Sequence, residues 1–123
     1  EDGFDSVLSL ELQRLVLQHG EVTLDIVSDL IFEDRAAPDA AREALACLGE
    51  MEDEATHKDR RGVLERCLAC SSHIARDGAV TGLSDLGDSR SIRALEAAAE
   101  REDYRLLRAN MVELAGKLRG GEQ

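Results

Sequence analysis

The chain carries apolar residues at helical spacing along almost its whole length. They recur three and four positions apart, the period of an amphipathic helix that buries one face, and short polar breaks divide them into segments. We expect helices near residues 4–19, 22–33, 38–48, 57–68, 73–86, 88–103 and 104–119. Ala, Leu, Val and Ile supply nearly all the apolar content and aromatic residues make up only 2%, which favours packed helices over strands.

Several segments begin at residues that cap helices. Asp5 or Ser6 fits the N-cap of the first segment. Pro38 fits the first turn of the third, and Thr56 or Asp59 fits the N-cap of the fourth. The expected core consists of the apolar-face positions: Val7, Leu8, Leu12, Leu15, Val16, His19, Ile26, Val27, Leu30, Ile31, Ala41, Leu45, Leu48, Val63, Leu64, Cys67, Leu68, Ile74, Ala79, Leu83, Leu86, Ile92, Leu95, Ala99, Leu107, Met111, Leu114, Ala115 and Leu118.

Three of the breaks share one short pattern. "QHGE" at 18–21, "CLGE" at 47–50 and "DLGD" at 85–88 each place Gly before an acid, between the two helices of an expected pair. The preceding segments also align: "APDAAREALACLGE" (37–50) with "ARDGAVTGLSDLGD" (75–88), 38 residues later, and "LRANMVELAGKLRG" (107–120), a further 32 later. Because short connections force successive helices to run antiparallel, the pattern predicts repeated helical hairpins.

The unit at residues 75–95 shows the repeat most fully. Arg and small residues open its first helix, Leu-Gly-Asp follows, and apolar residues continue into the second: Arg76, Ala79, Leu83, Leu86, Gly87, Asp88, Ile92 and Leu95. The preceding unit keeps Ala41, Leu45, Leu48 and Gly49 but has Glu50 in place of Asp. These units resemble the HEAT-like repeats of the bilin-lyase type, over residues 37–119 and, by extension, over residues 1–36.

The resemblance implies a fold and a kind of surface. HEAT-like repeats form an α-solenoid in which each hairpin shields its apolar faces by packing on the next, and the second helices line a concave surface that binds another macromolecule. We therefore expect an all-α fold, a short right-handed α-solenoid of about three and a half helical hairpins. It forms one domain over residues 1–123, and because the sequence opens on Glu1 we expect a module of a longer protein.

Gly87 and Asp88 invite a catalytic interpretation, because a glycine beside a carboxylate can line an active site. Their place between two helices gives a structural one instead. Gly adopts the left-handed conformation that ends a helix, and the Asp carboxylate accepts from the first N–H groups of the next helix. The same interpretation ends the third helix at Leu48–Gly49.

Charge is spread unevenly along the chain. The net charge is −11, and residues 1–36 hold nine acids against two bases. Nucleic-acid affinity comes mainly from Lys and Arg, so we expect no nucleic-acid partner. No run of 18 apolar residues occurs, so we expect no membrane partner. Three cysteines fit a reducing compartment, the cytoplasm, and thirteen Arg against two Lys fit a GC-rich bacterial genome.

The cysteines and histidines raise the question of a metal site. Cys67, Cys70 and His73 form C-x2-C-x2-H, and Cys47 and His57 are further candidate zinc ligands. A structural zinc site normally uses two such pairs, however, and Cys at i and i+3 also fits a small buried helix face. No phosphate-binding loop, nucleophile motif or His-Glu pair occurs either. We expect no metal, no cofactor, no catalytic residue and no enzyme.

Basic residues of the second helices are the candidate partner-binding residues. They are Lys58, Arg61 and Arg66 in one unit and Arg90, Arg93 and Arg101 in the next. Arg is favoured at interfaces because its planar fork pairs with carboxylates and stacks on rings. The same residues can instead pair with acids at i and i+4 and keep the helices soluble, and the sequence leaves both interpretations open.

The function that fits these features is a non-catalytic protein-interaction or scaffolding module that binds another protein on the concave second-helix face. An alternative is an acidic inhibitor of a basic partner protein, of the immunity-protein or antitoxin kind, motivated by the −7 balance of residues 1–36. A further alternative, from the resemblance, is a bilin-lyase-like chromophore handler. We expect a homo-oligomer or flanking repeats to cap the apolar ends of the stack.

Overall fold

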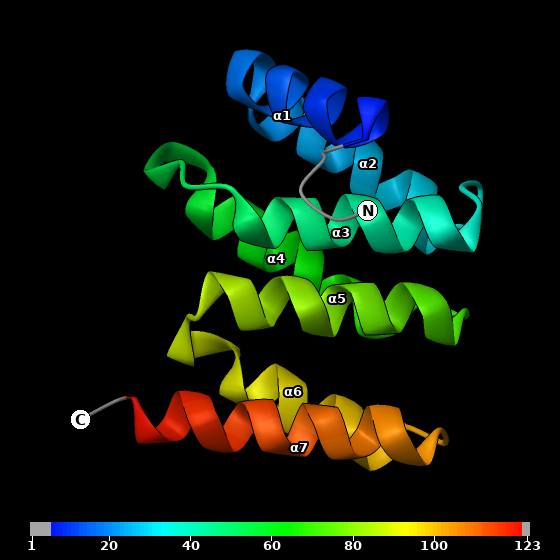
Figure 1. Ribbon diagram of the computed structural model, residues 1–123, viewed down its shortest axis with the longest axis vertical. Coiled ribbons are helices and arrows are strands. Elements are labelled where there is room, and N and C mark those ends of the chain that lie inside the picture. Colours follow the sequence, from blue (N-terminus) through cyan, green and yellow to red (C-terminus); the bar gives the residue numbers. More distant parts are fainter. Residues whose placement is uncertain (1–5, 122–123) are drawn as a thin grey trace.

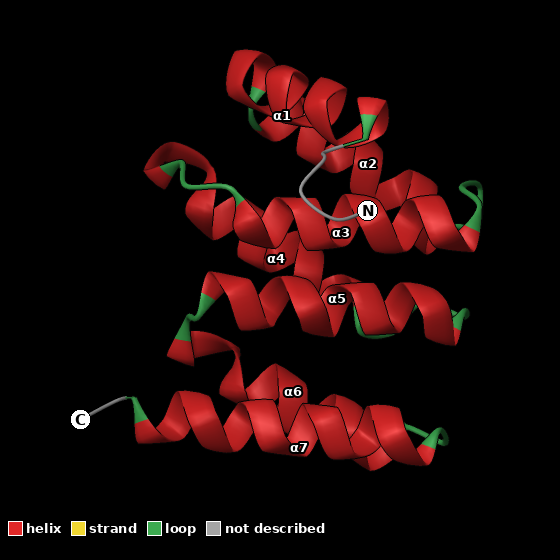
Figure 2. Cartoon of the chain, in the orientation of Figure 1, coloured by secondary structure: helices red, strands yellow, loops and turns green. Residues whose placement is uncertain are grey.

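The computed structural model describes residues 6–121, and the regular structure in this range is entirely helical (Figure 2). The α-helices are α1 (Val7–His19), α2 (Glu21–Phe32), α3 (Pro38–Glu50), α4 (His57–Cys67), α5 (His73–Leu86), α6 (Ile92–Arg101) and α7 (Arg105–Gly120). Two 3-10 helices, η1 (Glu54–Thr56) and η2 (Ser89–Ser91), precede α4 and α6. An all-helical chain without strands is therefore confirmed for these residues.

The helices lie in two layers. In one layer α1, α3, α5 and α7 follow one another in a row, and α2, α4 and α6 lie behind them (Figure 1). Within the first layer α3 contacts both α1 and α5, and α5 also contacts α7. In the second layer α2 contacts α4. The two layers therefore extend along one axis, and their two ends are formed by α1–α2 and by α6–α7.

Three of the expected caps form as the residue types require. Ser6 is the N-cap of α1, where its hydroxyl accepts a hydrogen bond from the Ser9 N–H at 3.0 Å, whereas Asp5 lies outside the described residues. Gly87 ends α5 in the left-handed conformation with φ 65°. The Asp88 carboxylate then accepts from the Arg90 N–H at 2.9 Å. Gly87 and Asp88 are therefore a joint between helices, as expected.

Gly49 has a different role from the one its sequence pattern predicts. α3 continues through Gly49 to Glu50, so the prediction that the helix ends at Leu48–Gly49 was wrong. The physical reason is packing against α5. A Cβ added at Gly49 would lie 2.1 Å from the carbonyl oxygen of Gly82, and one at Gly78 would lie 2.7 Å from the Cα of Arg42. These glycines let the backbones of α3 and α5 approach closely.

A buried arginine organises the connection between α3 and α4. The Arg60 side chain donates to the carbonyl oxygens of Leu48 (2.7 Å), Met51 (2.9 Å) and Asp53 (2.8 Å), and to the Thr56 hydroxyl at 2.9 Å. Burial lowers the pKa of Arg60, and its 1% exposure shows that these acceptors replace water. Thr56 is the N-cap residue of α4, but its hydroxyl makes no capping bond.

The helix boundaries near these connections differ from the expected ones. The connection between the helices expected at 38–48 and 57–68 is partly helical, because α3 extends into it to Glu50 and η1 precedes α4. The expected helix from residue 88 begins instead as η2, and α6 starts at Ile92. The terminal helix α7 begins one residue after the expected Tyr104, which serves as its N-cap residue.

The core runs along the interior of the stack. Its fully buried side chains come from successive helices: Val16, Leu24, Leu45, Leu48, Leu64, Cys67, Leu83, Leu95 and Met111. Four residues expected on buried faces are exposed instead: Val7 (84%), Leu8 (41%), Ile26 (55%) and His19. The reason is position, because α1 and α2 form one end of the stack and have neighbouring helices on one side only.

Candidate partner-binding groove

An open groove of about 540 Å³ lies between α2 and α4, the second helices of the first two pairs. Its lining residues come from both helices: Leu24, Asp25, Ser28 and Asp29 from α2, and Lys58, Asp59, Arg61, Gly62, Val63, Glu65 and Arg66 from α4. Leu24 and Val63 are buried, at 1% and 7% exposure. The groove therefore has apolar side chains at its base and charged side chains of both signs around them.

Gly62 is an exposed glycine inside α4, in the lining of this groove. A glycine within a helix costs about 1 kcal/mol relative to alanine, so its presence calls for a reason. The fold supplies none, because no atom lies within 4 Å of the place where a Cβ would stand. Gly62 therefore leaves open space above the α4 backbone in this groove.

Arg66 links the two helices that form the groove. Its Nη1 donates to Asp29 Oδ1 at 2.7 Å and to the Ser28 hydroxyl at 2.9 Å. The guanidinium also lies 4.4 Å from the centre of the Phe32 ring, close enough for a cation–π interaction. Arg66 is thus partly occupied by contacts within the chain, which join α4 to α2 across the groove.

Arg61 belongs to a charged cluster centred on Asp88. Asp88 Oδ2 lies 3.5 Å from Arg61 Nε and 2.8 Å from His57 Nε2. Arg90 also donates to the Asp88 carboxylate, through Nε at 3.0 Å and Nη2 at 2.9 Å. The Arg90 guanidinium holds the pKa of Asp88 well below its usual range, against the opposing effect of burial, and the hydrogen bond from His57 adds to the lowering. Asp88 therefore remains a carboxylate that joins α4 to η2.

The structure brings together three of the six candidate binding residues. Lys58, Arg61 and Arg66 line the groove. Arg90 is engaged with Asp88, whereas Arg93 and Arg101 are exposed on α6 and do not line the groove.

The acidic side chains of the groove were missed by the sequence analysis. They are Asp25, Asp29, Asp59 and Glu65. No sequence signal places the two α2 acids there, because contacts between α2 and α4, such as that of Arg66 with Ser28, decide which faces of the two helices meet.

The candidate zinc ligands have separate partners. Cys67 and Cys70 are buried together, and the hydrogen bond between their sulfurs, with burial, raises the pKa of Cys67, so that its sulfur is held as an unreactive thiol. The remaining candidates contact other groups. Cys47 donates to the Ser9 carbonyl oxygen, His57 bonds the Asp88 carboxylate, and the His73 ring stacks on the Tyr104 ring. Among residues 6–121, no group of three or more His, Cys, Asp or Glu side chains is placed to hold a metal ion.

Comparison of the chain with protein-family models, with curated proteins and with solved structures gives no match. None of the helices in the described range combines the length and the apolar character needed to cross a membrane.

Proposed function

We propose that the chain is a non-catalytic protein-interaction module, a short right-handed α-solenoid of HEAT-like hairpins that binds a protein partner in the α2–α4 groove. The observation that carries this function is the groove itself. It is open, has a buried apolar base at Leu24 and Val63, and contains an exposed glycine that the fold does not need.

The solenoid part of the proposal is supported by contacts between successive helical pairs. Several hydrogen bonds join residues 6–34 to residues 43–71: Ser6–Glu43, Cys47–Ser9, Arg66–Ser28, Arg66–Asp29, Cys70–Ile31 and Ser71–Asp34. Further along the chain, α3 packs on α5 and α5 contacts α7. Contacts of this kind, between each unit and the next, are those of a repeat stack.

The composition of the groove favours a protein as the partner. Lys58, Asp25 and Asp59 are exposed in its lining, so a bound segment meets both signs of charge around an apolar base. An amphipathic helix with charges of both signs fits such a surface. A phosphate backbone does not, because four acids stand among the three bases.

The test compares two matched glycine variants. Gly62→Arg fills the α2–α4 groove, and Gly116→Arg places the same side chain on an exposed helical glycine of α7, where a Cβ also meets no atom within 4 Å. Immobilised wild-type protein and both variants are incubated with a lysate of the source organism, and captured proteins are quantified by mass spectrometry. We expect a specific protein to bind the wild type and Gly116→Arg but not Gly62→Arg.

The same protein, once purified, should bind the wild type directly and lose at least ~10-fold in affinity with Gly62→Arg, measured by calorimetry. Binding that is equal for both variants would contradict the groove as the site. If no captured protein discriminates between them, the function as an interaction module through this groove is wrong.

One observation favours the acidic-inhibitor alternative. All six described acids of residues 6–36 are exposed: Glu11, Glu21, Asp25, Asp29, Glu33 and Asp34. An inhibitor that covers a basic protein with this surface should bind with an affinity that falls steeply as salt rises. A complex that is insensitive to salt but sensitive to Gly62→Arg supports the groove instead.

A further inference from the structure

The α2–α4 groove already contains one basic side chain bound to its α2 wall. Arg66 of α4 donates through Nη1 to Asp29 Oδ1 at 2.7 Å and to the Ser28 hydroxyl at 2.9 Å. Its guanidinium lies 4.4 Å from the centre of the Phe32 ring. A carboxylate of α2 therefore binds a guanidinium that crosses the groove from α4.

The contacts between these two segments show how α2 and α4 are aligned. Arg66 bonds Asp29 near the C-terminal ends of the two helices. Beyond the helix ends, the Ser71 hydroxyl donates to the Asp34 carboxylate at 2.6 Å. Residue numbers thus rise in the same direction along both helices. The residues one helical turn before a contacting pair therefore belong to the next level of the groove.

The level one turn before the Arg66–Asp29 pair holds an acid without a base. Its residues are Asp25 on α2 and Gly62 on α4, and both line the groove. Asp25 is exposed, and within residues 6–121 its side chain makes no hydrogen bond or ion pair. A Cβ added at Gly62 would meet no atom within 4 Å. Where α4 could carry a partner for Asp25, the groove therefore has open space.

The base of the groove at this level suits the stem of a long basic side chain. Leu24 precedes Asp25 and Val63 follows Gly62, and Leu24 and Val63 are both buried in the lining. An arginine extends its methylene stem along apolar surface and keeps its charged end at the polar edge. A guanidinium that enters here can lie over the apolar base and reach Asp25.

The other charged residues of the lining do not fill this position. Two of its three bases pair with two of its four acids, at 2.7 and 3.5 Å: Arg66–Asp29 and Arg61–Glu65. The remaining charges of the lining, which make no ion pair in the part of the chain that the structure describes, are Asp25, Asp59 and Lys58. Only Asp25 lies on the α2 side, across from Gly62. The open space therefore faces an unpaired acid.

We propose that the bound partner segment places an arginine in the space over Gly62, where it pairs with Asp25 and repeats the Arg66 contact with a side chain from another protein. The inference rests on the proposed function and names the side chain by which the partner is recognised. Arg fits better than Lys because its planar fork can bond both carboxylate oxygens. On a helical segment, apolar residues three or four positions away would then lie over the base of the groove.

Selection from a peptide library tests the identity of this side chain. Random peptides of ~15 residues displayed on phage are selected on immobilised wild-type protein, and those that also bind Gly62→Arg are removed. In Gly62→Arg the chain's own guanidinium fills the space beside Asp25. We expect the retained peptides to share an Arg, with apolar residues three or four positions from it.

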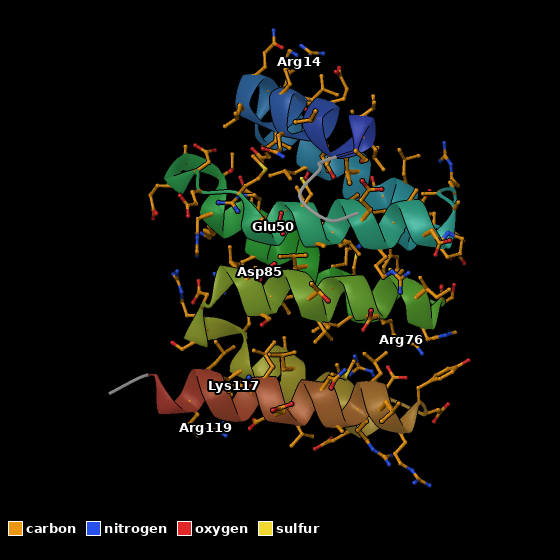
Figure 3. The ribbon with its side chains drawn as sticks, viewed as in Figure 1. Arg14, Glu50, Arg76, Asp85, Lys117 and Arg119 are labelled. Carbon is orange, nitrogen blue, oxygen red and sulfur yellow. The ribbon has the colours of Figure 1, made fainter. Side chains whose placement is uncertain are left out.

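Two substitutions, one in each molecule, test the ion pair itself. A synthetic retained peptide should bind Asp25→Asn at least ~10-fold more weakly than the wild type, measured by calorimetry. Replacing its shared Arg by Gln should cost as much on the wild type and nothing further on Asp25→Asn, because both changes remove the same contact. The matched control is Asp85→Asn. Figure 3 shows Asp85 on α5, in the layer of α3 and α5, so this variant should bind as the wild type does.

Three results would overturn the inference and leave the groove as a binding site. The retained peptides could share no Arg, Asp25→Asn could bind the peptide as tightly as Asp85→Asn does, or the losses from the two substitutions could add. If no selected peptide distinguishes the wild type from Gly62→Arg, the groove function is wrong and this inference with it. The two proposals therefore fail by different results.

Discussion

The middle of the stack and its open surfaces use glycine in opposite ways. Gly49 and Gly82 lie where α3 and α5 touch, and a Cβ on either would stand within 2.6 Å of backbone atoms. Gly62 and Gly116 also lie inside helices, but a Cβ on them would meet nothing within 4 Å. The fold requires Gly49 and Gly82, because a side chain at either position would push α3 and α5 apart. Gly62 and Gly116 lower the stability of their helices, and no packing contact in the fold requires them.

This difference separates stability from function within one residue type. Substitutions in the middle should act on folding, and substitutions in the grooves should act on binding. The same contrast extends to polar residues. Arg60 is 1% exposed and holds a connection, whereas Arg93, also on a second helix, is exposed and has no such role.

The largest effect is expected at the contact between α3 and α5. Gly49→Ala places a Cβ 2.1 Å from the Gly82 carbonyl oxygen, so the backbones must separate, and we expect a loss of at least ~3 kcal/mol in the free energy of unfolding. Gly62→Ala should instead stabilise the fold by up to about 1 kcal/mol. Urea denaturation measures both. If the Gly49→Ala protein were as stable as the Gly62→Ala protein, the proposed difference between packed and open glycines would be wrong.

Arg60 is expected to come next. Arg60→Met leaves three carbonyl oxygens and the Thr56 hydroxyl without this donor, and we expect a loss of about 3 kcal/mol in the free energy of unfolding. The control is Arg93→Met on the exposed face of α6, which should change stability by less than ~0.5 kcal/mol. Thermal unfolding at equal protein concentration compares the two. Equal melting temperatures would show that the connection between α3 and α4 does not need Arg60.

The junction of α5 with the α6–α7 end should give a smaller, pH-dependent effect. Buried Glu102 accepts from Arg76 Nε at 2.8 Å, Arg76 Nη2 at 3.0 Å and the Tyr104 N–H at 3.1 Å. Burial alone favours the neutral acid, but the hydrogen bonds from Arg76 and from Tyr104 outweigh it, so the pKa of Glu102 is lowered in the folded chain.

Because its folded pKa lies below its unfolded pKa of about 4.3, Glu102 contributes stability above that pH and loses it as pH falls through the folded pKa. Glu102→Gln should therefore cost on the order of 2 kcal/mol at pH 7 and less at low pH. Denaturation midpoints between pH 7 and pH 2 measure this. A constant difference between wild type and variant would contradict the linkage.

The smallest effect is expected at the α1–α2 end. Asp29 pairs with Arg66 at 2.7 Å, but the two side chains are 59% and 41% exposed, so solvent screens the pair. Asp29→Asn should lower stability by less than ~1 kcal/mol, measured by urea denaturation. A loss as large as that of Arg60→Met would mean that this end is held as tightly as the middle.

The features that depend on local chemistry could be predicted from the sequence. Helical periodicity located all seven helices of the described range, and Ser6, Gly87 and Asp88 form the caps that their residue types predict. The conformation of Gly49 could not be predicted in this way. It shares the Leu-Gly-acid pattern with Gly87, but a helix that lies against it, rather than its own sequence, decides its conformation.

The candidate site was predicted in part for the same reason. Lys58, Arg61 and Arg66 share a second helix, so their common surface could be inferred, whereas Arg60 on the same helix is buried. Whether a helical charge faces solvent or a neighbouring loop depends on the register between helices. The acids of α2 enter the groove through that register, which no local pattern contains.

Native-state hydrogen exchange tests the central claim most directly, at concentrations where the chain is monomeric. If the hairpins are held by their neighbours, amides in α3 and α5 should exchange only through the opening of highest free energy, and amides in α1, α2 and α7 through openings of lower free energy. Protection of α1 and α2 equal to that of α3 and α5 would contradict the account.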